Sequence, residues 1–369
     1  MMRVMARAFA LVLAACAVWL NLSPAFAADS DAPSAPAPAG IAIDGDGNVY
    51  VTDYALDRVV KFGPDGSVLG QWSGSGSSPG QFSGPFGVAV DSSNTVYVVD
   101  QLNNRVQRFA TDGTLLSAWG TAGAAAGDLR TPFGVAISNG HVYVADFGND
   151  RVDIFNGDGS LVSMFGSRGT GDGQFQRPAG VAVASDGTVY VTDHFNDRVE
   201  RFGADGHFQV QLGTLAAASQ QSATPTPVVT PASAPTAAAS STPTAAPTVV
   251  ATPSVTTSST AAPAPSVSPA GVPVAAEVQL QRPEGIALDR DGNVWVADYG
   301  HDRVVKLSPD GRLLLAIGSG GDLFGPKGVA VEPISGRIYI ADTGNGRVQR
   351  LMPDGTVDAS WPMPPPLSS

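Results

Sequence analysis

The sequence contains a single cysteine, Cys16, among 369 residues, and only 15% of its residues are charged. A fold held together by disulfides is therefore excluded, as are thiolate metal sites if Cys16 is removed with a leader peptide. Basic residues are also few: 21 Lys and Arg face 33 Asp and Glu, which gives a net charge of −12. This charge repels phosphate groups, so we expect no nucleic acid partner. With 43 glycines and 29 prolines, the composition predicts an all-β chain rich in turns.

Residues 1–27 have the pattern of an export signal, in which two arginines precede an apolar run and positions 25–27 read Ala-Phe-Ala, a small-x-small cleavage site. We therefore expect a secreted or cell-envelope protein that keeps no transmembrane segment after cleavage. A second interpretation remains open, because residues 13–16 read Leu-Ala-Ala-Cys and resemble a bacterial lipobox. In that case Cys16 would carry a lipid anchor.

A segment of the form aromatic-Val/Ile-x-Asp recurs six times, and the first four copies lie 47, 46 and 47 residues apart. Five residues after each Asp comes Arg-Val, followed by an Asp-Gly turn signal. The repeated residues are Asp53, Asp100, Asp146, Asp193, Asp298 and Asp342, with Arg58, Arg105, Arg151, Arg198, Arg303 and Arg347. One Asp and one Arg in every unit is typical of a structural network, because an active site would break the symmetry of the repeat.

Each unit predicts four short strands, which in the second unit cover residues 87–90, 96–100, 105–109 and 115–119. Such a unit cannot bury both of its faces alone, so its repetition is typical of a β-propeller, in which the blades stack in a ring. The sequence therefore predicts an all-β, six-bladed β-propeller. The predicted propeller spans 40–361, with blades at 40–84, 85–131, 132–177, 178–214, 283–325 and 326–361.

Three segments of the third unit resemble the NHL repeat family: Pro-Phe-Gly-Val-Ala at 132–136, Val-Ala-Asp at 144–146 and Asn-Asp-Arg-Val at 149–152. The chain is similar to members of the extracytoplasmic bacterial type. The resemblance implies a six-bladed propeller, a fold that serves in this family as a binding scaffold or a sensor domain and in some members as a lyase or lactonase.

The repeat is interrupted after the fourth unit by residues 215–277, which consist mainly of Ala, Pro, Thr and Ser. This composition cannot bury a core, so we expect a disordered insertion that is either a spacer or a partner-binding segment. The Pro-rich segments 28–39 and 362–369 are predicted to be tails, the first too rich in proline to pair well as a strand.

Function is sought where the units differ, beside the central channel, where the first strand of each blade begins and the second ends. The first position holds Ala39, Phe86, Phe133, Ala179, Glu284 and Lys327, and the second holds Tyr54, Gln101, Phe147, His194, Tyr299 and Thr343. We expect eight of them to form an aromatic ring with a few polar groups that binds a ligand: Phe86, Phe133, Glu284, Lys327, Tyr54, Phe147, His194 and Tyr299. The alternative is that the aromatic side chains plug the channel.

No metal site, cofactor or catalytic residue is predicted. The four histidines, His141, His194, His207 and His301, occupy four different positions of the repeat, whereas a zinc site needs converging ligands. The acidic segments 44–48 and 289–293 resemble the start of a calcium loop but lack its later glycine and glutamate, so they are interpreted as hairpin turns. Glu284 lies in a Pro-Glu-Gly segment that resembles the metal-binding start of six-bladed lactonases, without a visible Asn and Asp partner set.

These observations predict an exported, non-catalytic scaffold or sensor that recognises a protein, a peptide or an envelope glycan through the channel mouth. Two alternatives remain open. One is a lactonase or lyase centred on the channel, and the other is a structural envelope protein that acts through its Thr/Pro-rich insertion.

Overall fold

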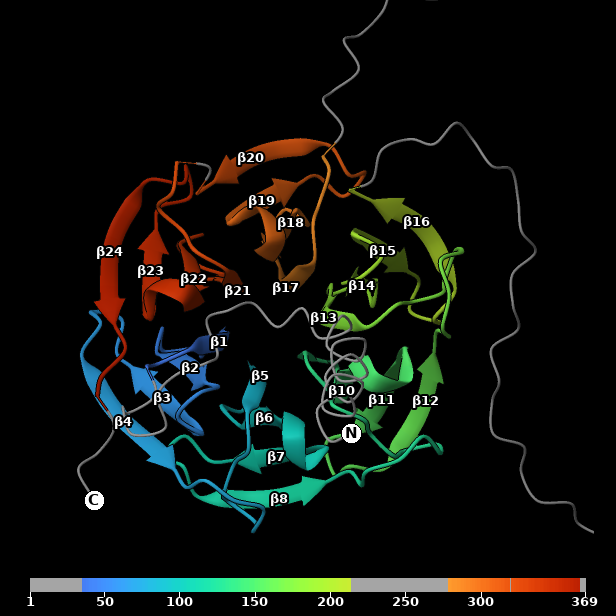
Figure 1. The fold of residues 1–369 in the computed structure, drawn as a ribbon, viewed down its shortest axis with the longest axis horizontal. Coiled ribbons are helices and arrows are strands. Elements are labelled where there is room, and N and C mark those ends of the chain that lie inside the picture. Colours follow the sequence, from blue (N-terminus) through green and yellow to red (C-terminus); the bar gives the residue numbers. More distant parts are fainter. Residues whose placement is uncertain (1–34, 214–277, 319, 366–369) are drawn as a thin grey trace, which may run out of the picture.

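The computed structural model describes residues 35–213, 278–318 and 320–365, which form six four-stranded antiparallel sheets arranged in a ring (Figure 1). The predicted all-β, six-bladed propeller is confirmed. The helices in the described ranges are short 3₁₀ turns, and none of them has the length or the hydropathy to cross a membrane.

The strands of each blade follow chain order from the channel outward. Blade 1 contains β1 (Pro38–Ile43), β2 (Val49–Asp53), β3 (Arg58–Phe62) and β4 (Val68–Ser73); blade 2 contains β5 (Pro85–Val90), β6 (Val96–Asp100), β7 (Arg105–Phe109) and β8 (Leu115–Trp119); blade 3 contains β9 (Val135–Ser138), β10 (His141–Asp146), β11 (Arg151–Asn156) and β12 (Leu161–Phe165). Blade 4 contains β13 (Pro178–Val183), β14 (Val189–Asp193), β15 (Arg198–Phe202) and β16 (Phe208–Leu212); blade 5 contains β17 (Pro283–Leu288), β18 (Val294–Asp298), β19 (Arg303–Leu307) and β20 (Leu313–Ile317); blade 6 contains β21 (Pro326–Val331), β22 (Ile338–Asp342), β23 (Arg347–Leu351) and β24 (Val357–Pro362). A 3₁₀ turn follows the second strand of four blades: η3 (Gln101–Asn103), η4 (Phe147–Asn149), η5 (Tyr299–His301) and η6 (Thr343–Asn345).

The core lies between the blades. In β6, Val98 packs with Tyr50 and Val59 of blade 1, whereas the next residue, Val99, points to the other face and packs with Val144 of blade 3. Successive side chains of a strand face opposite sides of a sheet, so a strand that is apolar at every position fits a blade that has a neighbour on both sides. This explains why all five residues of β6 are buried.

The recurrence of Asp-Gly together with a large apolar residue in the fourth strand also has a packing cause. Gly113, in the turn of blade 2, has a φ of +88°, and a Cβ added there would lie 2.9 Å from the Trp72 side chain of blade 1. The turn therefore needs glycine both for its backbone conformation and for the close approach of the tryptophan.

The ring closes between blades 6 and 1 without an exchanged strand, because β24 pairs with β23 of its own blade. Beyond β24, Met363 is buried, and the carbonyl oxygens of Pro364 and Pro365 accept hydrogen bonds from the guanidinium of Arg58. In blade 2 the corresponding arginine, Arg105, donates instead to carbonyls of the loop between blades. The C-terminal residues thus take the place of an inter-blade loop at the closure.

Both predicted tails therefore contribute to the propeller. Pro38, within the predicted tail 28–39, pairs with Asp53 as the first residue of β1. A proline is tolerated at a strand start, because its missing N–H is not needed there. At the other end, Pro362 is the last residue of β24 and pairs with Arg347.

Blades 4 and 5 are neighbours although a long segment separates them in the sequence. The backbone N–H of Leu280 donates to the carbonyl of Gly213 at 3.3 Å, and the innermost strands β13 and β17 lie side by side (Figure 1). The predicted insertion, residues 215–277, lies outside the described residues, as do the predicted signal segment and Cys16.

Candidate functional site

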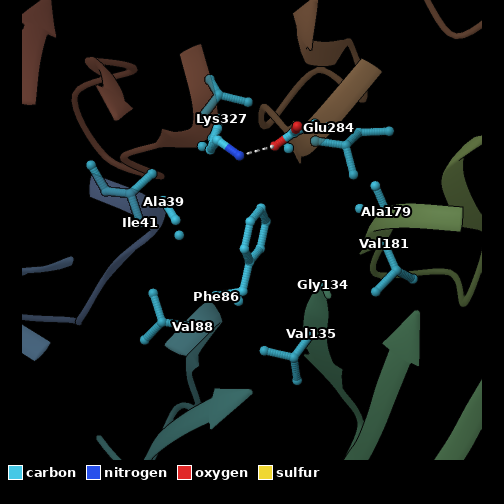
Figure 2. A pocket seen from close by; sticks show the side chains of 17 residues that line it. Ala39, Ile41, Phe86, Val88, Gly134, Val135, Ala179, Val181, Glu284 and Lys327 are labelled. Atoms are coloured by element: carbon cyan, nitrogen blue, oxygen red, sulfur yellow. Dashed lines mark ion pairs between the residues drawn. The ribbon is translucent and has the colours of Figure 1, made fainter. Parts of the chain in front are cut away.

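The channel mouth is built where the first strand of a blade starts and the second ends. In blade 1, Pro38 of β1 pairs with Asp53 of β2, and in blade 2 Pro85 pairs with Asp100. Because the first strands surround the channel, side chains near their starts converge on it, as Figure 2 shows.

Five of the eight predicted mouth residues form an arc of ring contacts. Tyr54 packs edge-on against Phe86, with ring centres 6.2 Å apart, and Phe86 packs against Phe133 at 4.3 Å. Phe133 stacks on Phe147 at 4.0 Å, with only 12° between the ring planes. Phe147 in turn contacts His194 at 5.9 Å. The arc therefore connects side chains of blades 1 to 4.

The other three predicted residues complete the mouth. The Nζ of Lys327 lies 5.2 Å from the ring centres of both Phe86 and Tyr299, and 3.6 Å from Oε2 of Glu284. The structure thus brings all eight residues into one connected cluster, called here the mouth cluster.

Phe86 plugs the channel. Its side chain is only 7% exposed, and its ring points across the channel toward the Lys327–Glu284 pair (Figure 2). The cavity at this level offers about 60 Å³ to water-sized molecules, which is room for a few waters but far below the roughly 300–1,000 Å³ of an organic ligand site. The channel at this level therefore cannot hold an organic ligand, whereas the side chains of Tyr54, Phe133, Phe147 and Tyr299 at the mouth are partly exposed.

Burial controls the charges in the cluster. It lowers the pKa of His194 to about 4, so the imidazole is neutral at pH 7, with Nδ1 3.4 Å from the carbonyl oxygen of Pro283. Burial also raises the pKa of Glu284, against the opposing effect of the Lys327 ammonium. Oε2 of Glu284 makes no hydrogen bond with the described residues. The cluster thus contains a buried carboxyl group whose Oε2 is paired with the Lys327 ammonium at 3.6 Å, beyond hydrogen-bond distance.

The histidines lie apart. His207 pairs with Asp205 in an exposed turn. Nδ1 of His301 lies 3.0 Å from the carboxylate of Asp298. The other 3₁₀ turns have an asparagine in the position of His301, for example Asn149, which donates to Asp146. His141 starts β10, on another edge of the blade. Within the described ranges, no three His, Cys, Asp or Glu side chains gather as metal ligands.

The two acidic segments are hairpin turns. The carboxylate of Asp44 accepts hydrogen bonds from the backbone N–H groups of Asp46 and Asn48 and from the Asn48 and Tyr50 side chains. Asp289 is held in the same way and also pairs with Lys306 at 2.9 Å. These bonds occupy the oxygens that a cation would need.

Each repeated Asp forms an ion pair with the Arg of its own unit, at N–O distances of 2.7 to 3.4 Å. The second carboxylate oxygen ties down the loop between blades, as where Asp100 accepts the backbone N–H of Ser83 at 2.7 Å. All six Asp side chains are fully buried. The geometry is that of a joint between blades and recurs in every unit, except that in blade 3 the Nε of Arg151 donates to Asp153 instead of Asp146.

Two buried acids beside this network were not singled out from the sequence. Seven residues after the repeated Asp, blades 2 and 6 carry Gln107 and Gln349, which donate to Asp100 and Asp342. Blades 3 and 4 carry Asp153 and Glu200 at the same position. Burial, the largest effect, raises the pKa of Asp153 to about 7 and of Glu200 to about 8. The replacement of glutamine by an acidic residue at this repeat position was the sequence signal that could have identified them.

We expect the Glu200→Gln variant to be more stable than the wild type in alkaline solution. The folded-state pKa of Glu200 is raised, so the unfolded chain loses this proton first; stability falls as the pH rises from about 4.5 to about 8 and then levels off. Glutamine has no proton to lose and can donate as Gln107 does. Thermal unfolding should show a gain on the order of 2–4 kcal/mol at pH 9 and little difference at pH 4. Equal pH profiles would contradict the assignment of a protonated Glu200.

Comparisons with known proteins agree with this fold. The NHL repeat model matches residues 82–109, 129–155 and 175–202, and the model of the SMP-30/Gluconolactonase/LRE-like region matches residues 249–324. A search of curated proteins finds no match.

Among solved structures, virginiamycin B lyase from Staphylococcus aureus is 13% identical with a TM-score of 0.53, over 89% of this chain and 84% of that one. A streptogramin B lyase is 12% identical with a TM-score of 0.55, over 91% and 86% of the two chains. A gluconolactonase from Xanthomonas campestris is 16% identical with a TM-score of 0.52, over 84% of each. At such identities the similarity shows the fold alone.

The fold and its mouth define a six-bladed β-propeller whose channel is filled by Phe86, with the eight residues of the mouth cluster gathered at one end of the channel. The NHL repeat model matches segments of blades 2, 3 and 4, and the remaining blades share the same four-strand order. The resemblance to the NHL family is thereby confirmed.

Proposed function

We propose that this protein is a non-catalytic binding module that holds a ligand on its channel-mouth face. The observation that carries the proposal is the mouth cluster itself: four partly exposed aromatic side chains lie over a channel that Phe86 closes. Exposed aromatic side chains gathered at one place dominate the energetics of binding surfaces. The ligand class is a protein, a peptide or a cell-envelope glycan, and the signal pattern of residues 1–27 supports a site of action outside the cytoplasm.

Further apolar surface borders the cluster. Phe195 is 55% exposed and contacts both His194 and Phe147. Leu102 is 51% exposed and lies with Tyr54 beside Gly84. Burial of this surface by a ligand supplies the driving force for association.

We expect the double variant Tyr54→Ala/Tyr299→Ala to lose its ligand with little change in unfolding temperature, because both side chains are partly exposed. Phe86 is unsuitable for this test because it is buried in the channel, where truncation would leave a cavity. The measurement is retention from an envelope extract on immobilised protein, with the retained proteins and glycans identified by mass spectrometry.

The matched control is Leu116→Ala, which removes an exposed apolar side chain from the outer strand β8. Retention that survives Tyr54→Ala/Tyr299→Ala and is lost on deletion of residues 215–277 would assign recognition to the insertion instead. That result would favour the structural envelope protein over the propeller-based binding module.

A lactonase or lyase is the second candidate, because one observation favours it. The Glu284 carboxyl group is buried with Oε2 held only by the 3.6 Å ion pair with Lys327 among the described residues, and Glu284 lies within the range matched by the gluconolactonase-type model. Turnover of a panel of sugar lactones and cyclic depsipeptides, abolished by Glu284→Gln, would establish this activity. Ligand retention without turnover supports the binding module.

A further inference from the structure

Three arginines come from the loops that lead into three consecutive blades, and all three reach the mouth. Arg130 packs against Gly148 of η4. The guanidinium of Arg177 lies 5.3 Å from the ring centre of Phe147. Arg282 directly precedes Pro283, and its positive charge acts on two groups of the mouth cluster: it helps to lower the pKa of His194 and opposes the rise that burial causes in the pKa of Glu284. These three side chains, called here the arginine arc, follow blades 3, 4 and 5 around the ring.

Two of these arginines hold a backbone conformation that favours glycine. The φ angles are +62° at Arg177 and +47° at Arg282. The equivalent loop positions of blades 2 and 6 are Gly84 and Gly325, at +59° and +53°. A side chain in this left-handed region costs stability relative to glycine. The conformation of the loop therefore does not explain the arginines, and such strain is characteristic of functional positions.

The arc is basic although the chain is acidic. Among the described residues, the guanidinium groups of Arg130 and Arg282 make no hydrogen bond or ion pair. The carboxylates of Asp150 and Asp197 accept hydrogen bonds from the backbone N–H groups of Arg177 and Arg282 and so brace the loops. In a protein of net charge −12, unpaired guanidinium groups beside an apolar cluster fit carboxylate partners.

The aromatic cluster discriminates between classes of ligand. Phe133 covers one face of Phe147 and Arg177 lies over this ring as well, while Phe86 packs on Phe133. Lys327 covers both Phe86 and Tyr299. A sugar ring or a nucleobase stacks on a free aromatic face, but here Phe133 and Phe147 stack on each other, and cationic groups lie over the rings of Phe147, Phe86 and Tyr299. The exposed Phe195 beside these occupied rings suits contact with an aliphatic or aromatic side chain.

We propose that the mouth binds a polypeptide segment that carries Asp or Glu carboxylates beside an apolar side chain. The carboxylates pair with the arginine arc, and the apolar side chain packs between Phe195 and the mouth cluster. This proposal rests on the proposed function and specifies its ligand. The partner is an acidic, apolar-anchored peptide and not an acidic glycan.

The test begins with a random dodecapeptide phage library panned on the full-length protein. Enriched peptides are then synthesised, and their affinity is measured by fluorescence anisotropy at 50 and 300 mM NaCl. The informative variant is Arg177→Gly/Arg282→Gly, because glycine relieves the left-handed backbone while removing both charges. The control is Thr131→Gly, which makes the same backbone change at a φ of +42° without removing a charge.

We expect enriched sequences that combine Asp or Glu with an apolar residue, and affinity that falls at high salt. Arg177→Gly/Arg282→Gly should weaken binding about tenfold or more while its unfolding temperature stays equal or rises, and Thr131→Gly should bind as the wild type does. A merely structural role for these arginines would lower the unfolding temperature instead.

Peptides that bind equally well to Arg177→Gly/Arg282→Gly but are lost by Tyr54→Ala/Tyr299→Ala would overturn this proposal and leave the binding module standing. Enrichment of no peptide, with binding of polygalacturonate or of single-stranded RNA, would also overturn it, in favour of an acidic glycan or a nucleic acid. Binding of none of these probes would count against both proposals.

Discussion

A chain that ends at Met352 is expected to show no cooperative unfolding transition, because it cannot close the ring. The truncation removes β24, whose Trp361 stacks on Phe62 of blade 1 with ring centres 5.7 Å apart. Loss of one such tryptophan costs about 3–5 kcal/mol; in addition, β23 loses its pairing with β24 and Arg58 loses the carbonyl groups of Pro364 and Pro365. The sum is comparable to the roughly 5–15 kcal/mol that stabilises a whole domain. Calorimetry and near-UV circular dichroism provide the measurement.

Two further truncations test the closure itself. A chain that ends at Pro365 keeps every contact described here and should unfold like the full-length protein. A chain that ends at Pro362 keeps β24 but loses buried Met363 and the two carbonyl groups that accept from Arg58, so it should unfold at a lower temperature. A soluble chain that ends at Met352 and has a native transition would contradict the proposed closure.

Replacement of Asp53 by alanine should destabilise the fold by about 3–5 kcal/mol, the usual cost of leaving a buried charge unpaired. Arg58 is only 2% exposed, and its Nε and Nη2 both lie 3.0 Å from Oδ2 of Asp53. The Asp53 carboxylate also accepts the backbone N–H of Ala37, which ties down the chain ahead of β1. Denaturant-induced unfolding measures the loss.

The control for this variant is Asp205→Ala, which breaks an exposed pair with His207 and should leave stability unchanged within error. The losses of Asp53→Ala and Arg58→Ala should not add in the double variant, because the two residues act as one unit. Equal stability of Asp53→Ala and Asp205→Ala would show that the repeated pair is not the joint between blades.

The repeat predicted which residues lie at the mouth, but it did not predict the contacts that these residues make with one another. The repeat register placed Phe86, Phe133, Glu284 and Lys327 at equivalent starts of first strands, and the structure gathers them at the channel. The sequence could not show that Phe86 of blade 2 reaches across the channel, where its ring centre lies 5.2 Å from the Nζ of Lys327 of blade 6. The sequence also could not show that Glu200 is fully buried, although it differs visibly from Gln107 at the same position of the repeat.

The sequence by itself determined the blade, because each unit carries its own strands, turn and ion pair. The predicted strands 96–100, 105–109 and 115–119 coincide with β6, β7 and β8, since alternation of side chains and the Asp-Gly turn are local properties. Only the tertiary structure decided which of the residues at equivalent repeat positions are buried and which are exposed. Phe86 fills the channel whereas Phe133, one blade later, is partly exposed, because side chains from six blades converge on space for few of them. Closure of the ring also had no local signal, because Arg58 meets the carbonyls of Pro364 and Pro365 only after six blades bring the two chain ends together.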